Sequence, residues 1–351
     1  MSLLTIFFVM KLPDVAIEYM QRGLQLCVSV VIPSLFPFMV ASELIVTSGA
    51  TSVLKKPLGM FSRRLFGISG RGATAFLLGT LCGFPIGTRA AVSMYKRGEI
   101  SFDELSRLVC FSNNPSSAFV ISAVGVTLYG CRSFGVALYF ITVLSSVIVG
   151  VGQNLLLGSG RAAEAVLSEN DRDREHKGIA QFSGAVSGAA HSMLSVCGFV
   201  VFFSTFTGTL GEVALSLGLS EQLRALLFSV FELTSGAASA ACVKPLKLSV
   251  LIVAFALGWS GLSVHFQVVS ICEGTGVRVG RYFLAKLWQG IVNVILVWAY
   301  FLLFGDRLSF EVESVGVFSF LSAKPLRVGI LTSFILLVLL LLMKLYRDKK
   351  K

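Results

Sequence analysis

The sequence predicts an all-α integral membrane protein, a polytopic helical bundle of about 8–10 membrane segments. Of its 351 residues, 55% are hydrophobic and only 14% are charged, whereas soluble domains carry about 25% charged residues. The charges are clustered and leave uncharged runs of 16 to 34 residues, and about 20 apolar residues cross the hydrocarbon core. Backbone amides in lipid must be paired internally, so these runs are predicted to be helices rather than open sheet.

The uncharged runs define the candidate membrane segments, and two further helices are predicted between them. Lys55–Phe66 has the composition of a basic helix at the membrane interface. Ser101 and Glu104 form a capping box that predicts the start of a short helix. In chain order the uncharged runs are Gly23–Ser42, Gly72–Thr88, Leu108–Cys131, Ser133–Gly160, Gly178–Gly211, Leu248–Cys272, Leu287–Gly305 and Val328–Met343.

The distribution of basic residues indicates a membrane partner and no nucleic acid. The net charge is +11, but the basic residues flank the apolar runs, as in Arg63–Arg64, Lys96–Arg97 and the tail Lys344–Lys351. Cytoplasmic loops of membrane proteins are enriched in Lys and Arg. These clusters are therefore predicted to face the cytoplasm and anionic lipid.

The sequence predicts neither an enzyme nor a metal or cofactor protein. Its seven cysteines lie mostly within apolar runs, without a CxxC pair, and predict buried helix contacts rather than a metal or disulfide framework. His176, His191 and His265 form no pair at the i,i+4 spacing of a zinc site, and no GxSxG elbow is present. We therefore expect no catalytic residues, no metal and no cofactor.

The charge pattern divides the chain into two membrane halves. Phe76–Gly79 resembles Phe255–Gly258, and Gly83 matches Gly261 at nearly the same offset. Repeated halves with interrupted helices recur in transporters, so two repeats, tandem or inverted, are predicted. The boundaries are a first membrane half 1–157, a charged loop 158–178, a second membrane half 179–305, a loop 306–327, and a C-terminal membrane helix with a basic tail 328–351.

A first polar interruption is predicted within the run that ends at Thr88. Glycines at 79, 83 and 87 form a close-packing stripe, while Pro85 removes an amide donor and disturbs the preceding turn. Two interpretations remain open: a kinked, tightly packed helix whose Arg89 reaches the interface, and a break that lines a substrate site. The candidate substrate-binding residues of this interruption are Phe84, Pro85, Gly87, Thr88 and Arg89.

A second interruption is predicted at Ser112–Ser117, six consecutive turn-prone residues between apolar runs. As the tip of a helical hairpin or an unwound segment, it would offer donors and acceptors to a polar solute. The alternative is an ordinary exposed loop between two helices. Asn113, Asn114, Ser116 and Ser117 are the candidate binding residues.

A third feature is an acidic residue that follows an apolar run. Glu232 comes directly after Ala225–Phe231, and ionisable groups inside a membrane span usually have a partner or a task. It could bind a cation, carry a proton or bond a substrate, together with Thr234 and Ser235; alternatively, it marks the end of the span. Glu43 is a similar acid with the same ambiguity.

Four motifs within about 100 residues resemble those of a known family. They are Val31–Met39, Gly79–Gly87 with its Gly-Phe-Pro-Ile-Gly sequence, Tyr95–Leu108 and Phe111–Asn114. Their order and spacing resemble the YlbJ-like sporulation integral membrane proteins, among the Gate-domain (nucleoside-recognition) membrane proteins. The resemblance is strong over 12–150 and looser over 180–300, where Glu232–Gly236 resembles the second acidic motif of the family.

The resemblance implies a multi-pass protein of spore maturation that moves dipicolinic acid across the outer forespore membrane. It also implies a distant likeness to concentrative nucleoside transporters, whose sites form at helical hairpins and unwound helices. Arg89 suits the implied substrate, because a guanidinium pairs bidentately with a carboxylate. The expected partners are thus a small anionic solute and membrane lipid, with a homo-oligomer or a sporulation membrane protein as further partners.

Two other functions remain open from the sequence. One is a non-transporting membrane scaffold of sporulation, with its functional residues in Ser159–Lys177 and the basic tail. The other is a transporter of nucleosides or another metabolite. The leading prediction is a small-solute transporter that works by alternating access around a site near the midplane.

Overall fold

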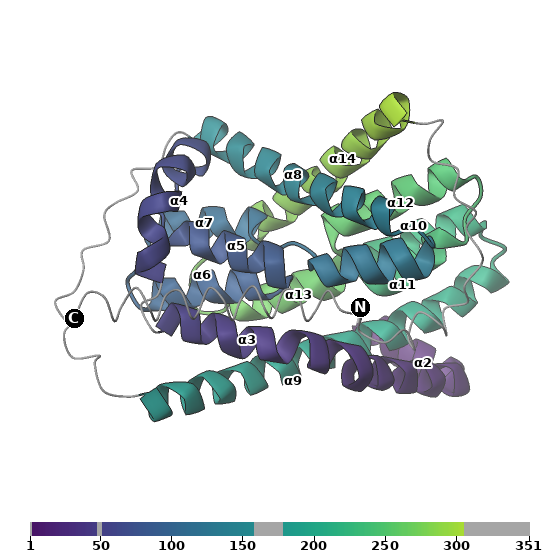
Figure 1. The fold of residues 1–351 in the computed structure, drawn as a ribbon. Helices are drawn as coiled ribbons and strands as arrows, with labels where there is room; N and C mark the ends of the chain where they lie inside the picture. The colour runs from purple at the N-terminus through teal and green to yellow at the C-terminus, as the bar shows by residue number, and fades with distance from the viewer. Residues whose placement is uncertain (1, 48–50, 158–177, 305–351) are drawn as a thin grey trace.

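The computed structural model describes residues 2–47, 51–157 and 178–304, which form helices joined by short turns (Figure 1). The elements of the first half are α1 (Ser2–Lys11), α2 (Pro13–Leu26), the π-helical η1 (Cys27–Val31), α3 (Ile32–Thr47), α4 (Thr51–Phe66), α5 (Gly72–Cys82), α6 (Ile86–Lys96), α7 (Phe102–Phe111), the π-helical η2 (Phe119–Leu128) and α8 (Arg132–Leu157). Those of the second half are α9 (Gly178–Ser216), α10 (Glu221–Phe231), α11 (Leu233–Ala241), α12 (Leu246–Trp259), α13 (Gly261–Ile271) and α14 (Val279–Phe304).

The predicted all-α membrane fold is confirmed. The described residues contain no strand, and α4 forms the helix predicted over Lys55–Phe66. Ser101 caps α7 by accepting a hydrogen bond from the Glu104 amide, as the capping box predicts. The predicted charged loop Ser159–Lys177 and the predicted C-terminal helix and tail lie outside the described residues. Within the described residues, four segments are long and apolar enough to cross a membrane, namely Arg132–Leu156, Gln181–Ser216, Leu246–Ile271 and Val279–Leu303.

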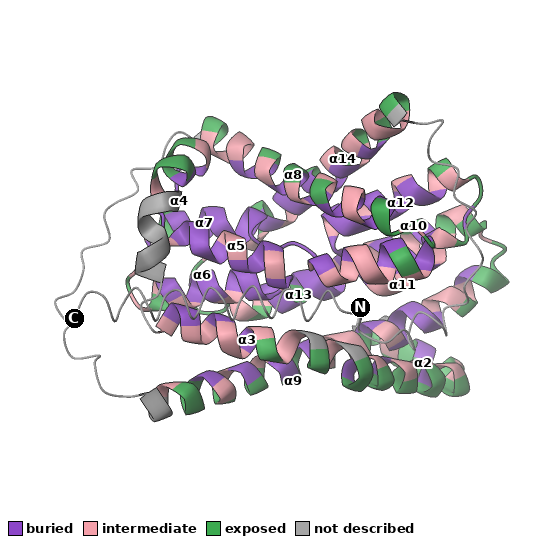
Figure 2. Cartoon of the chain, viewed as in Figure 1, coloured by how far each residue is buried: buried purple, intermediate pink, exposed green. Residues whose placement is uncertain are grey.

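The shorter helices lie between two groups of outer helices on opposite sides of the molecule (Figure 1). Helix α9 runs beside α2 and α3 along one side of the molecule, and α8 and α14 cross each other on the opposite side (Figure 1). The shorter helices α5, α6, α7, α11 and α13 lie between these two groups (Figure 1). Figure 2 shows that α5, α6 and α7 are largely buried, whereas the outer helices carry exposed residues. Exposed apolar side chains such as Phe140, Leu144 and Leu302 on α8 and α14 are suited to face lipid.

The same order of helices occurs in each half of the described chain. A broken pair (α5 and α6) is followed by a second broken pair (α7 and η2) and then by α8, which has 26 residues. In the second half the broken pairs are α10–α11 and α12–α13, and α14 also has 26 residues. This order matches α5 with α10, whereas the short sequence matches at Gly79 and Gly258 would match α5 with α12. The division into two repeats remains a prediction.

Each break has a local cause in the sequence. Gly83 follows the last residue of α5 and has a φ of +90°. Ser260 and Gly261, at the junction of α12 and α13, have φ values of +73° and +78°. Residues other than glycine rarely adopt positive φ values. Pro115 lacks an amide donor, and the neighbouring Ser116 hydroxyl accepts a hydrogen bond from the Phe119 amide at the start of the next helix. The two predicted interruptions, at Phe84–Gly87 and Ser112–Ser117, are therefore both present.

The breaks within each half pack against each other. A Cβ added at Gly79 or Gly87 would lie 1.8 or 2.1 Å from the carbonyl oxygen of Ser112, and one at Gly83 would lie 2.7 Å from the Ser116 Cβ. The stripe of glycines thus provides the predicted close packing, but across a break rather than along one continuous helix. In the second half, a Cβ on Gly261 would meet the backbone of Glu232 at 3.1 Å.

Candidate functional site

The break between α5 and α6 places Thr88 in the interior and Arg89 in an ion pair. Thr88 is fully buried, and its hydroxyl has no hydrogen-bond partner among the described residues. Phe84 is partly buried and packs against the apolar cluster formed by η2, α8 and α10–α12. Gly87 has no room for a side chain, because the Ser112 carbonyl closes over it. Of the residues predicted here, Thr88 has the polar atom that a solute could engage.

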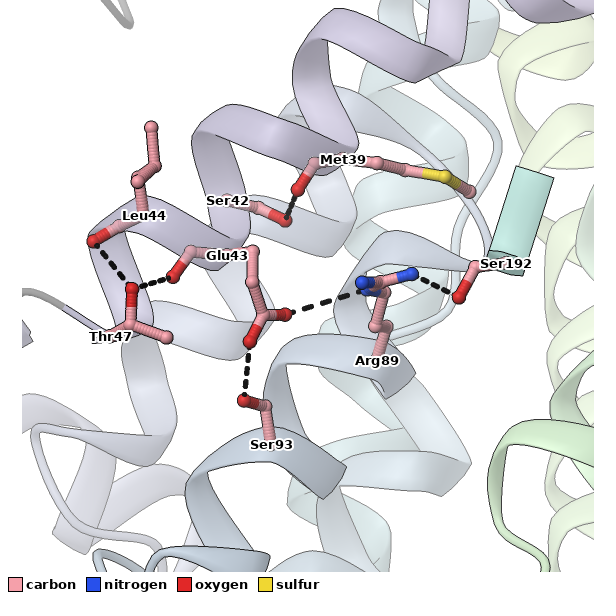
Figure 3. A network of polar contacts seen from close by, with 8 residues as sticks. All are labelled: Met39, Ser42, Glu43, Leu44, Thr47, Arg89, Ser93 and Ser192. Carbon is pink, nitrogen blue, oxygen red and sulfur yellow. Dashed lines mark hydrogen bonds and ion pairs between the residues drawn. The ribbon is translucent and has the colours of Figure 1, made fainter. Parts of the chain in front are cut away.

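Arg89 joins three helices through its guanidinium (Figure 3). Its Nε lies 3.5 Å from the Oε2 atom of Glu43 on α3, and its Nη1 donates to the hydroxyl of Ser192 on α9. Ser93, one turn further along α6, donates to Oε1 of Glu43 at 3.0 Å. Glu43 and Arg89 therefore form an ion pair in a largely buried setting, with side chains 17% and 11% exposed. Because Arg89 already has a carboxylate partner within the protein, its pairing with a solute remains a prediction.

The second break places both of its asparagines in the centre of the molecule. Asn113 and Asn114 are fully buried, so Ser112–Ser117 is not an ordinary exposed loop in this structure. Asn114 accepts a hydrogen bond from Gln289 Nε2 at 2.8 Å and donates to the Phe111 carbonyl at 3.0 Å. Asn113 donates to the Tyr282 hydroxyl at 3.3 Å, while its own Oδ1 has no hydrogen-bond partner in the part of the chain that the structure describes. The side chain of Asn113 therefore keeps one unused acceptor.

Helix α14 supplies polar groups to this break that sequence reasoning missed. Lys286 is fully buried, and its Nζ donates to the Asn113 carbonyl at 2.9 Å and to Gln289 Oε1 at 2.7 Å. Gln289 and Asn293 are also fully buried. Spacings of three and four residues place side chains on one helix face, so this polar face could have been found in the sequence. It was missed because Lys286 was assigned to the boundary of the run Leu287–Gly305.

Helix α13 completes the group with a histidine. His265 Nδ1 lies 2.9 Å from the Tyr282 hydroxyl, and the imidazole packs edge-on against Trp259 with ring centroids 4.2 Å apart. His265 is thus a packed, hydrogen-bonded histidine, although its Nε2 is buried without a partner. The described residues contain no group of three or more His, Cys, Asp or Glu residues that could hold a metal ion. We refer to Asn113, Asn114, His265, Tyr282, Lys286 and Gln289 as the central polar cluster.

Glu232 uses its carboxylate to cap a helix. Oε1 and Oε2 accept hydrogen bonds from the amides of Thr234 and Ser235 at 2.8 and 2.6 Å, at the start of α11. Glu232 is 9% exposed and forms the break between α10 and α11. The predicted residues Glu232, Thr234 and Ser235 therefore lie together. Their contact is a helix cap, in which the Glu232 carboxylate accepts hydrogen bonds from the backbone amides of Thr234 and Ser235.

Removing this cap should destabilise the start of α11. We expect Glu232→Ala to lower the free energy of unfolding by about 1–2 kcal/mol, because two amides at the start of α11 lose their acceptor. Glu232→Asn should restore most of the loss, because asparagine is a good N-cap without charge. Thermal unfolding in detergent measures both variants. Equal losses in the two variants would show that the charge of Glu232, rather than its capping geometry, is what the fold requires.

With this arrangement described, the chain can be compared with known proteins. No protein-family model matches it, and no solved structure matches it. Among curated proteins, it is 29% identical over 323 residues to the sporulation integral membrane protein YlbJ of Bacillus subtilis (strain 168). The chain is thus similar to YlbJ. The match covers 82% of this chain and 78% of YlbJ, and it confirms the resemblance to YlbJ-like sporulation membrane proteins predicted from the four motifs.

Proposed function

We propose that the chain is a transporter of a small carboxylate solute, dipicolinate, across the outer forespore membrane during spore maturation. The observation that carries the proposal is the meeting of a broken helix with buried polar groups from the other half of the chain. The break at Asn113 and Asn114 contacts Lys286 and Gln289, which lie more than 170 residues away in sequence. The proposal assigns no catalytic step to the protein.

The unfavourable free energy of burying unpaired polar atoms supports this proposal. Buried polar atoms without partners are unfavourable and are rare in the interiors of folded proteins. Within residues 2–47, 51–157 and 178–304, the buried hydroxyls of Thr88, Ser112 and Ser117 have no hydrogen-bond partner, and neither do Asn113 Oδ1 and His265 Nε2. All five residues lie in or beside the broken helices α5–α6, α7–η2 and α12–α13. A polar solute that binds between these helices would provide the missing partners.

The architecture supports alternating access around such a site. Interrupted helices that carry a binding site between two halves are a recurrent arrangement in secondary transporters. In this chain α14 contacts both α7 and α8, and α6 contacts α13, so helices of the two halves flank the central polar cluster. The similarity to YlbJ supports the setting in sporulation, and the dipicolinate substrate comes from the family resemblance.

Uptake of dipicolinate by the purified protein in liposomes tests the proposal. We expect saturable uptake by the wild type and a loss of at least about tenfold in an Asn113→Ala/Asn114→Ala variant, because both amides line the break. His191→Ala is the matched control, since this side chain is exposed and its Nδ1 lies within hydrogen-bond distance of the Ser187 carbonyl of its own helix. Absence of uptake by folded wild-type protein under every ion or proton gradient would favour a scaffold. Uptake of nucleosides but not of dipicolinate would show that nucleosides, rather than dipicolinate, are the substrate.

A further inference from the structure

We propose that Lys286 binds a carboxylate of the solute and sets the preference of the transporter for anions. This inference rests on the proposed transport function and adds the residue that recognises the charge. Lys286 lies on α14 with its side chain fully buried. A buried amine is retained in a membrane span mainly where it has a partner or a task.

Among the described residues, the hydrogen bonds of Lys286 leave one of its N–H donors unused. An ammonium group has three N–H donors and no acceptor. Two of these donors are used by the Asn113 carbonyl and Gln289 Oε1, at 2.9 and 2.7 Å. Both acceptors are neutral, and they hold Nζ at the break between α7 and η2. The third donor is available for an oxygen atom that enters the break.

Two other largely buried basic side chains, Arg89 and Arg97, differ from Lys286 in their partners. Arg89 pairs with Glu43, and Arg97 pairs with Glu99. Lys286 has no carboxylate within ion-pair distance among the described residues, although its side chain is more deeply buried than either arginine. Within the described part of α14, the other charged residue is Arg281, which is also basic. An isolated buried charge is unfavourable, and an incoming anion relieves it.

The break that Lys286 contacts through the Asn113 carbonyl also contains neutral polar groups that suit an anion. Ser112 and Ser117 lie in this break, and each buries a hydroxyl without a hydrogen-bond partner among the described residues. Hydroxyl groups can donate to a carboxylate, and a charge-assisted bond from an ammonium is shorter and stronger than a neutral one. Gln289 and Asn114 hold each other through a 2.8 Å hydrogen bond and so fix the cluster around Nζ. The geometry therefore provides one fixed cation at a break that also contains neutral donors.

The test compares dipicolinate with pyridine-2,6-dicarboxamide, its uncharged analogue of similar shape. Binding to the purified full chain is measured by calorimetry in detergent, and uptake is measured in liposomes. We expect the wild type to bind dipicolinate and to bind the diamide at least about tenfold more weakly. Lys286→Met should weaken dipicolinate binding about 10- to 100-fold, since hydrogen bonds to charged groups have this strength, and should leave binding of the diamide unchanged. Lys247→Met, at an exposed lysine on α12, is the matched control and should behave as the wild type.

The outcomes separate this inference from the proposed function. Dipicolinate transport by Lys286→Met with wild-type affinity would overturn the role of Lys286 and leave the transport function intact. Equal affinity of the wild type for the diacid and the diamide would also overturn it, and this comparison needs no variant that must fold. Wild-type protein that neither binds nor transports dipicolinate would remove both the inference and the proposed substrate.

Discussion

Replacing Gly87 with alanine is expected to prevent the normal packing of α5, α6 and α7. The added Cβ would lie 2.1 Å from the Ser112 carbonyl oxygen and 2.8 Å from the Gly79 Cα. Both neighbours are backbone atoms, so no side-chain rotation can relieve the overlap. Overpacking of a well-packed interior costs about 1–3 kcal/mol and sometimes more, and we expect Gly87→Ala to lie at or beyond the upper end. The variant should show a large drop in melting temperature and a low yield of monodisperse protein.

A matched substitution distinguishes this clash from a general effect of alanine in a helix. A Cβ added at Gly198 on α9 would meet no atom within 4 Å, and alanine is a better helix former than glycine by about 1 kcal/mol. Gly198→Ala should therefore be neutral or slightly stabilising. If Gly87→Ala unfolded at the same temperature as Gly198→Ala, α5 and α6 could not be as closely packed against Ser112 as the structure describes.

Breaking the ion pair between Glu43 and Arg89 is expected to give the second largest loss. Glu43→Gln leaves the Arg89 charge without its carboxylate partner, and Arg89→Gln leaves the Glu43 carboxylate with only the Ser93 hydroxyl. Removal of one partner from a largely buried pair costs about 3 kcal/mol or more. Because the pair joins α3 to α6, and Arg89 also contacts Ser192 on α9, both single variants should unfold at lower temperatures in detergent.

The double variant Glu43→Gln/Arg89→Gln completes a double-mutant cycle that measures the coupling between the two side chains. Two glutamines leave no uncompensated charge, so the double variant should be more stable than the sum of the two single losses predicts, with a coupling energy of about 1–3 kcal/mol. Strict additivity would contradict an ion pair between these helices. Dipicolinate uptake is also measured for the single variants. An Arg89→Gln variant that stays folded but loses uptake would show that Arg89 has a role in transport as well.

The sequence alone determined the fold class and the positions of two breaks. Long uncharged runs can satisfy their amides in lipid only as helices, which decided the all-α membrane fold. Pro85 with its neighbouring glycines and Pro115 beside two asparagines act on the backbone around them, so their effect is visible in a window of a few residues. For the same reason the break at Ser112–Ser117 and the cap at Ser101 were found without tertiary contacts.

Only the tertiary structure decided which polar groups meet. Lys286 stood at the end of an uncharged run and was assigned to a boundary, but it is fully buried and bonded to the carbonyl of Asn113. The sequence left two interpretations of Arg89 open, and only the fold shows that its guanidinium contacts Glu43 on α3. The carboxylate of Glu232 caps α11. Side chains that lie far apart in sequence come together through the packing of whole helices, and local chemistry contains no information about that packing.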